Sequence, residues 1–240
     1  MNDIKHLINY TRTFLFFTVA AAVLLISAAS AFANDEEEFI KAAFAGKPET
    51  IKQLLEKGIN VNLQNDKGFS TLIIASQYGH ADIVNLLLEN KANVDLQNAG
   101  GATALIIAAK NGYADVVNAL LSKGAKVDAQ TTDGITALML ATQKGHESIV
   151  DALLAKNANV NLQTKEKLTA LMLAALDGRT SIVDKLLARN AKIDVQASDN
   201  TTALYMAARN GHTAIVETLL AKNAPVDLIA ANDTTPLYIA

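Results

Sequence analysis

The feature that most constrains this chain is a strict internal repeat of 33 residues. A leucine and a glycine each return with this step, at Leu72, Leu105, Leu138, Leu171, Leu204 and Leu237 and at Gly46, Gly79, Gly112, Gly145, Gly178 and Gly211. No insertion interrupts either series. Such a period is typical of solenoids, in which each supersecondary unit packs only against its neighbours. The sequence therefore predicts an elongated stack of similar units.

Each unit has the pattern of a helix, a turn, a second helix and an extended loop. In one copy, Ser70 can cap the first helix, and the column of Gly79 is expected to end it in a left-handed conformation. The second helix is predicted over about Asp82–Glu89, with an apolar stripe on one side. The extended tails then lead into glycine-containing turns, which we expect to project as short β-hairpin fingers.

The residue that ends each second helix is expected to have a positive φ. This column contains Gly58, Lys91, Gly124, Asn157, Asn190 and Asn223. Glycine and asparagine reach positive φ with the least strain. Lys91 departs from the pattern, so the sequence predicts a strained or altered cap there.

Composition excludes several kinds of site. The chain has no cysteine, which excludes disulfides, thiolate metal sites and cysteine nucleophiles. Its formal net charge is −3 and no basic run is present, so we expect no nucleic-acid partner. Aromatic residues make up only 5%, and small aliphatic side chains must therefore pack the layers.

The first 33 residues have the order of a secretory signal peptide. Lys5 and Arg12 precede an uncharged run, Phe14–Ala29, and Ala31 and Ala33 occupy the positions that a signal peptidase requires before Asn34. This predicts cleavage after Ala33 and a periplasmic or secreted protein. The alternative is a retained membrane anchor, because residues 14–33 are long enough to span a bilayer.

With these residues in view, the chain resembles the ankyrin repeat family. The resemblance rests on Thr132–Leu138 (TDGITAL), Gly145-His146, Ile149-Val150, Leu153-Leu154 and Asn157–Asn161, and the same frame recurs over residues 34–240. It implies an all-α solenoid of helix-turn-helix units with hairpin fingers. The units are an N-terminal cap (34–65), repeats at 66–98, 99–131, 132–164, 165–197 and 198–230, and an incomplete repeat at 231–240.

The chain departs from the family pattern in one column. The family histidine that follows the motif leucine is replaced by Ile73, Ile106, Met139, Met172, Tyr205 and Tyr238. We expect apolar contacts to replace the hydrogen bonds which that histidine makes in the family.

The two ends of the chain have different sequences. Acidic Asp35–Glu38 lies where an N-terminal cap needs a polar face. Residues 234–240 begin a further unit and stop within its first helix. We expect a fragment of a longer array, the alternative being an array without a normal C-terminal cap.

No constellation of catalytic residues is apparent. His80, His146 and His212 lie two repeats apart, too distant to share a metal ion, and we expect them to make hydrogen bonds at turns. No nucleophile–base pair or phosphate loop is present in the sequence. The sequence predicts a protein that is not an enzyme and that needs no metal or cofactor.

A glutamine also recurs before each finger, at Gln64, Gln97, Gln130, Gln163 and Gln196. The favoured interpretation is a set of hydrogen bonds from finger to finger. The alternative is a polar ladder that binds a peptide.

Positions that vary between copies are candidates for partner binding, because they do not all serve the shared fold. The resemblance places them on the concave groove that binds proteins in the family. The candidates are Asp66, Lys67, Phe69, Gln77, Tyr78, Lys110, Asn111, Asp133, Ile135, Lys144, Leu168, Leu176 and Arg209. The apolar members Phe69, Tyr78, Ile135, Leu168 and Leu176 are the expected anchors.

The sequence thus predicts an exported, monomeric protein-binding module. Two alternatives remain open: a scaffold anchored to the membrane through residues 14–33, and a secreted effector directed at a host.

Overall fold

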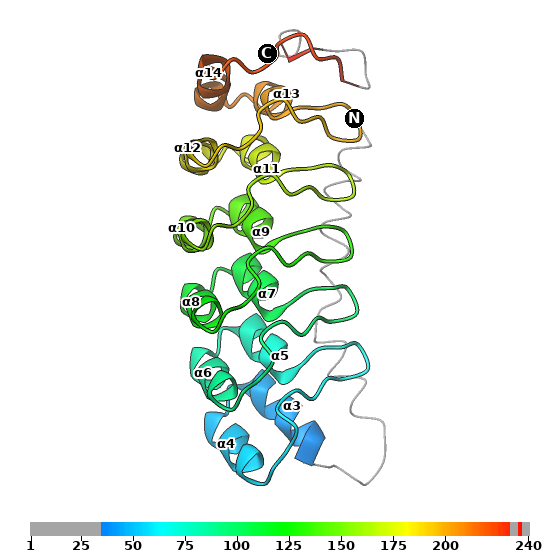
Figure 1. Ribbon diagram of the computed structural model, residues 1–240, viewed down its shortest axis with the longest axis vertical. Coiled ribbons are helices and arrows are strands. Elements are labelled where there is room, and N and C mark those ends of the chain that lie inside the picture. The colour runs from blue at the N-terminus through cyan, green and yellow to red at the C-terminus, as the bar shows by residue number, and fades with distance from the viewer. Residues whose placement is uncertain (1–34, 231–234, 237–240) are drawn as a thin grey trace.

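The computed structural model describes residues 35–230 and 235–236, which form a single elongated stack of helix pairs (Figure 1). The predicted signal peptide, its cleavage site at Ala31, Ala33 and Asn34, and most of the incomplete repeat lie outside the described residues. Within the described residues the regular structure is helical, and the one β-bridge joins Gln64 to Ser70.

The helices form two parallel layers, with the fingers projecting beyond the first layer (Figure 1). The first layer contains α3 (Asp35–Ala45), α5 (Thr71–Tyr78), α7 (Ala104–Asn111), α9 (Ala137–Lys144), α11 (Ala170–Leu176) and α13 (Ala203–Arg209). The second contains α4 (Pro48–Glu56), α6 (Ala81–Glu89), α8 (Ala114–Ser122), α10 (Glu147–Ala155), α12 (Thr180–Ala188) and α14 (Thr213–Ala221).

Single residues fix both ends of the first helices, as predicted. The Ser70 hydroxyl accepts a hydrogen bond from the Ile73 N–H at 3.2 Å, and threonine does the same in the later repeats. Gly79 ends α5 with φ 74°, in the left-handed region. A cap that satisfies an otherwise unpaired N–H contributes about 1 kcal/mol to helix stability.

The loop after each second helix contains the predicted residue with positive φ. Lys91 has φ 64°, within a few degrees of Asn157 at 59° and Asn223 at 61°. Lys91 therefore adopts the same cap conformation as the asparagines, and the strain expected from its Cβ at this φ stays a prediction.

The core is a continuous column of aliphatic side chains between the two layers. Leu87, Leu120 and Leu153 are completely buried at equivalent positions of α6, α8 and α10. The side chains that replace the family histidine are buried too, with Ile73 and Met139 each only 1% exposed. Apolar packing therefore occupies the column from Ile73 to Met172, as expected; Tyr205 is buried too, and Tyr238 lies outside the described residues.

The fingers are tight hairpin turns that are bonded to one another through their backbones. Within a finger, the Asn98 N–H donates to the Ala102 carbonyl at 3.0 Å. Between fingers, one N–H of each finger donates to a carbonyl of the preceding finger, in the pairs Ala99–Lys67, Thr132–Gly100, Lys165–Asp133 and Ser198–Glu166, at 2.9–3.0 Å. This backbone ladder keeps the fingers parallel.

Across residues 35–230 and 235–236, the helices are too short or too polar to cross a bilayer.

Candidate functional site

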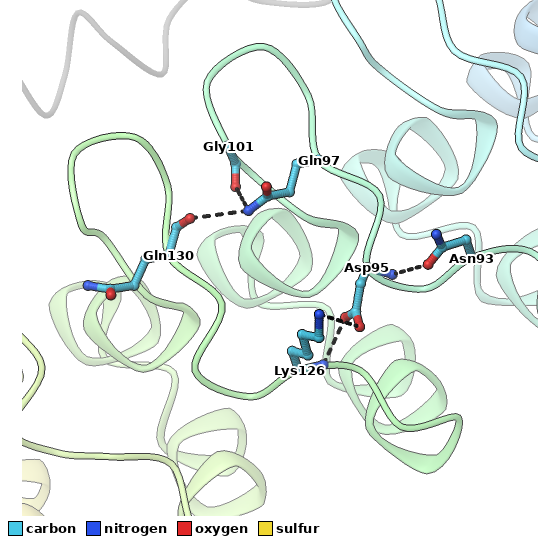
Figure 2. A network of polar contacts seen from close by, with 6 residues as sticks. All are labelled: Asn93, Asp95, Gln97, Gly101, Lys126 and Gln130. Atoms are coloured by element: carbon cyan, nitrogen blue, oxygen red, sulfur yellow. Dashed lines mark hydrogen bonds and ion pairs between the residues drawn. The ribbon is translucent and has the colours of Figure 1, made fainter.

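The glutamine column is used to hold the fingers together. The Gln97 side-chain amide donates to the Gly101 carbonyl at 2.9 Å in its own finger and to the Gln130 carbonyl at 3.3 Å in the next (Figure 2). Gln64 and Gln130 make the equivalent pairs of bonds. The interpretation favoured from the sequence is confirmed for Gln64, Gln97 and Gln130. Within the described residues, the Gln196 amide bonds only to the Asn200 carbonyl of its own finger, and no finger-to-finger bond of the Gln163 side chain is found.

A second ladder joins the loops that precede the fingers. An Asp95 carboxylate oxygen accepts from the Lys126 N–H at 2.9 Å, and the Asn93 amide oxygen accepts from the Asp95 N–H at 3.0 Å (Figure 2). Asn62, Asp128 and Asn161 accept from the following repeat in the same way. This ladder was not predicted from the sequence, although the recurring Asn or Asp at this position is a signal from which it could have been predicted.

The histidines make turn contacts. His146 Nε2 lies 3.2 Å from the Lys110 carbonyl oxygen, and His80 and His212 make the same contact with Phe44 and Leu176. This agrees with the hydrogen-bonding role expected from the sequence. In the described part of the chain, no three His, Cys, Asp or Glu side chains group closely enough to hold a metal ion.

The candidates on the fingers differ in accessibility. Asp66 is exposed, and Lys67, Phe69 and Asp133 are half-buried. Asp133 also forms an ion pair with Lys165 of the next finger at 3.3 Å.

Two expected anchors are part of the core. Ile135 and Leu168 are only 8% and 7% exposed and pack with the other buried side chains. Ala102 and Thr201 are buried at the same position in their repeats, so this position is used for packing even though its identity varies. Phe69, Tyr78 and Leu176 are the expected anchors that retain accessible surface.

The remaining candidates form a row where the first helices end. This helix-end row contains the last two residues of α5 and α7 and the last residue of α9, α11 and α13, namely Gln77, Tyr78, Lys110, Asn111, Lys144, Leu176 and Arg209. Neighbouring members are in contact, since the Asn111 amide donates to the Gln77 carbonyl at 3.0 Å. The structure thus brings these residues together along the length of the array.

An aromatic cluster lies at the N-terminal part of the helix-end row. The Phe44 and Tyr78 rings meet edge to face at 4.7 Å between centroids, and Tyr78 stacks against His80 at 6.2 Å. Burial, with a smaller contribution from Tyr113, raises the pKa of Tyr78 above its ordinary value. Phe44 and Tyr113 were not among the predicted site residues, although Tyr113 stands out in the sequence because it interrupts the histidine column.

Charged side chains dominate the middle of the row. Burial lowers the pKa of Lys110, and the positive charge of Lys144 lowers it further. In the next repeat, burial raises the pKa of Asp177, and Arg179, Lys144 and His212 partly offset this rise. The charge of Lys144 in the row therefore acts on the carboxylate of Asp177, the residue that follows α11.

Comparison with known proteins gives a consistent result. The family model described as "Ankyrin repeats (3 copies)" matches residues 39–131, 126–199 and 171–240. The crystal structure of the human ASB11 ankyrin repeat domain is similar, with a TM-score of 0.75 and 32% identity over 84% of this chain and 90% of that one. An ankyrin repeat protein of Pseudomonas aeruginosa is 40% identical over 52 residues, which cover 20% of this chain and 30% of that protein.

Proposed function

Because this chain belongs to the ankyrin repeat family, whose members are generally non-catalytic protein–protein interaction modules, we propose that it binds a protein partner through its concave face. This face is made by the fingers and the helix-end row. The partner contacts the accessible side chains of both, with Phe69 and Tyr78 as apolar anchors.

The observation that carries the proposal is a difference between two kinds of position: repeated residues make structural hydrogen bonds, whereas the variable residues of the helix-end row keep accessible side chains. Glutamines and loop Asn and Asp residues are engaged in hydrogen bonds between repeats, and the capping residues are engaged in bonds to their own helices. The helix-end row instead differs from repeat to repeat and keeps accessible aromatic and charged groups. Aromatic side chains are enriched among the residues that dominate binding energy at protein interfaces.

The test is a capture experiment in which the chain is immobilised on a support and incubated with an extract of its native compartment. Replacing Phe69 and Tyr78 together with alanine is expected to abolish capture of the specific partner. The matched control, Lys123→Ala with Lys156→Ala, changes two exposed residues at the ends of α8 and α10 and should leave capture intact. If the double variant keeps its circular dichroism spectrum and still captures the same partner, this surface is not the binding site.

Export of the protein is part of the same proposal. The basic start, the apolar run and Ala31 and Ala33 before Asn34 support a cleaved signal peptide and a periplasmic or secreted module. The N-terminal sequence of the protein from its host should begin at Asn34. A mature chain that starts at Met1 and resists carbonate extraction from membranes would favour the anchored scaffold instead.

A further inference from the structure

Two lysines in the middle of the helix-end row lack ion-pair partners in the described part of the chain. Lys110 is the penultimate residue of α7 and Lys144 is the last residue of α9. Neither ammonium forms an ion pair there, although the charge of Lys144 does act on the carboxylate of Asp177. Some lysines elsewhere do form such pairs, since Lys165 lies 3.3 Å from Asp133 and Lys185 lies 2.8 Å from Asp151, whereas Lys123 and Lys156 form none within the described residues.

The two lysines come from helix ends that touch each other. His146, two residues after Lys144, lies 3.2 Å from the Lys110 carbonyl through its Nε2 atom. The same imidazole ring packs over Gly112, two residues after Lys110. The charge of Lys144 also acts on Lys110 and, with burial, lowers its pKa. Two like charges are therefore held near each other, and one of them is partly buried.

The polarity of the helices explains only part of this arrangement. A helix C-terminus carries a partial negative charge, which favours a cation in its last turn. That attraction is equally available to a fully solvated lysine. It gives no reason for a partly buried ammonium without a counter-charge, which costs free energy unless a partner compensates it.

We propose that Lys110 and Lys144 together bind the carboxylates of an acidic, extended segment of the partner protein. The inference rests on the proposed function and specifies the chemistry of the partner. Asp177, the residue that follows α11 one repeat beyond Lys144, limits the acidic part of the segment to the two repeats of α7 and α9.

Lys110 and Lys144 lie in adjacent repeats at positions that differ by one residue, so the distance between packed helices sets the approximate spacing of the carboxylates. Packed helices lie about 8–10 Å apart. A polyproline-II segment has three residues per turn and a rise of about 3.1 Å per residue, so side chains three residues apart are about 9 Å apart on one face. The segment therefore presents acidic residues at every third position.

The test uses fluorescence anisotropy of a labelled proline- and serine-rich peptide with glutamate at every third position. The whole chain should bind this peptide, and the same peptide with glutamine in place of glutamate should bind at least about tenfold more weakly. Binding should also weaken when the salt concentration rises from about 0.05 M to about 0.5 M, because salt screens the charges.

Matched charge reversals locate the site. Lys110→Glu with Lys144→Glu should reduce peptide affinity at least about tenfold, whereas Lys123→Glu with Lys156→Glu changes the net charge equally and should leave it within about twofold. The milder Lys110→Gln with Lys144→Gln variant should give an intermediate loss, and it serves if the reversal variant does not fold.

Three outcomes would overturn the inference. The first is failure of the wild-type chain to bind the glutamate peptide, and the second is equal sensitivity to both pairs of charge reversals. The third is that inorganic polyphosphate binds at the same two lysines more tightly than the peptide, because the lysines would then form a phosphate-binding site. The capture assay separates the two proposals. A partner that is lost with the Phe69 and Tyr78 substitutions but retained after both lysine reversals would support the protein-binding surface. The same result would contradict binding of an acidic segment.

Discussion

The outer sides of the first and last described second helices carry different side chains. In α4, Thr50 occupies the column that holds Ile83, Val116 and Ile149 in the interior, and it is half-buried. In α14, Val216 and Leu220 keep the apolar residues of an interior repeat, yet Leu220 is 44% exposed where its counterpart Leu154 is 4% exposed. The N-terminal end is thus polar by sequence, whereas α14 has the sequence of a helix with a neighbour on both sides.

This contrast indicates that the contribution of a side chain to the stability of a solenoid depends on the repeats that cover it. Each repeat buries its apolar stripe only against the repeats on either side. Identical residues at equivalent positions should therefore contribute very different amounts to stability in the middle of the array and at its end. Pairs of equivalent positions allow this to be measured within one chain.

The largest expected difference is between Leu154→Ala and Leu220→Ala. Removing the buried Leu154 side chain should lower the free energy of unfolding by about 2–5 kcal/mol, because a cavity remains. The exposed Leu220 should lower it by less than about 1 kcal/mol. Urea unfolding followed by circular dichroism measures both values. Equal losses would contradict the dependence on neighbours.

Gly112→Ala and Gly211→Ala provide a second matched pair, with φ 83° and 71° respectively. An alanine at either position should cost about 1 kcal/mol for its left-handed backbone. At Gly112 the new Cβ would also lie 2.7 Å from the His146 ring, whereas at Gly211 it meets nothing within 4 Å.

The Gly112→Ala variant should therefore lose about 2 kcal/mol or more, because displacing the ring also breaks the His146 contact with the Lys110 carbonyl. Thermal unfolding of the two variants side by side measures the difference. If both lose the same amount, the ring contact adds nothing to the backbone strain.

Lys91→Asn should stabilise the interior by up to about 1 kcal/mol, since asparagine tolerates the φ of 64° that Lys91 adopts. The reciprocal Asn223→Lys change at the last repeat, with φ 61°, should destabilise the whole array less than this. Hydrogen exchange at amides of α6 and α14 would report each change locally. A Lys91→Asn variant no more stable than the wild type would show that the cap is unstrained.

The smallest effect is expected at the N-terminal end. Lys57 pairs with Asp35 at 3.0 Å, but both side chains are more than half exposed. Exposed ion pairs contribute about 0–1 kcal/mol. Lys57→Ala should thus change the urea midpoint only slightly, and less at high salt than at low salt. Lys156→Ala, at the end of α10, is the matched control without a recorded ion pair.

Much of the fold could be predicted because its signals are local and repeated. Ser70, Gly79 and Asn157 each indicate a helix end through the chemistry of one residue, and the period places every copy. The partners of Gln97 could also be anticipated, since its column recurs with the fingers. The Asp95 ladder was missed because an Asn or Asp in a loop is also consistent with simple solvation.

The candidate site was harder to predict, because variation between repeats does not distinguish binding from packing. Ile135 and Leu168 vary and are nevertheless buried. Phe44 and Tyr113 became candidates only once their rings were placed beside Tyr78 and Gly79. The side-chain environment of Lys110 depends on the neighbouring repeat, and periodicity alone carries no information about it.

The ladder between fingers has a consequence for how such a chain can change length. Its donors and acceptors are backbone groups, as in the bond from Ala99 to Lys67, and they are offered again by every copy. Duplication or deletion of one 33-residue unit by recombination would therefore join a finger to a new neighbour without loss of these bonds. The sequence at the helix end of a new unit could then change, while the backbone bonds between fingers still held the unit in the stack.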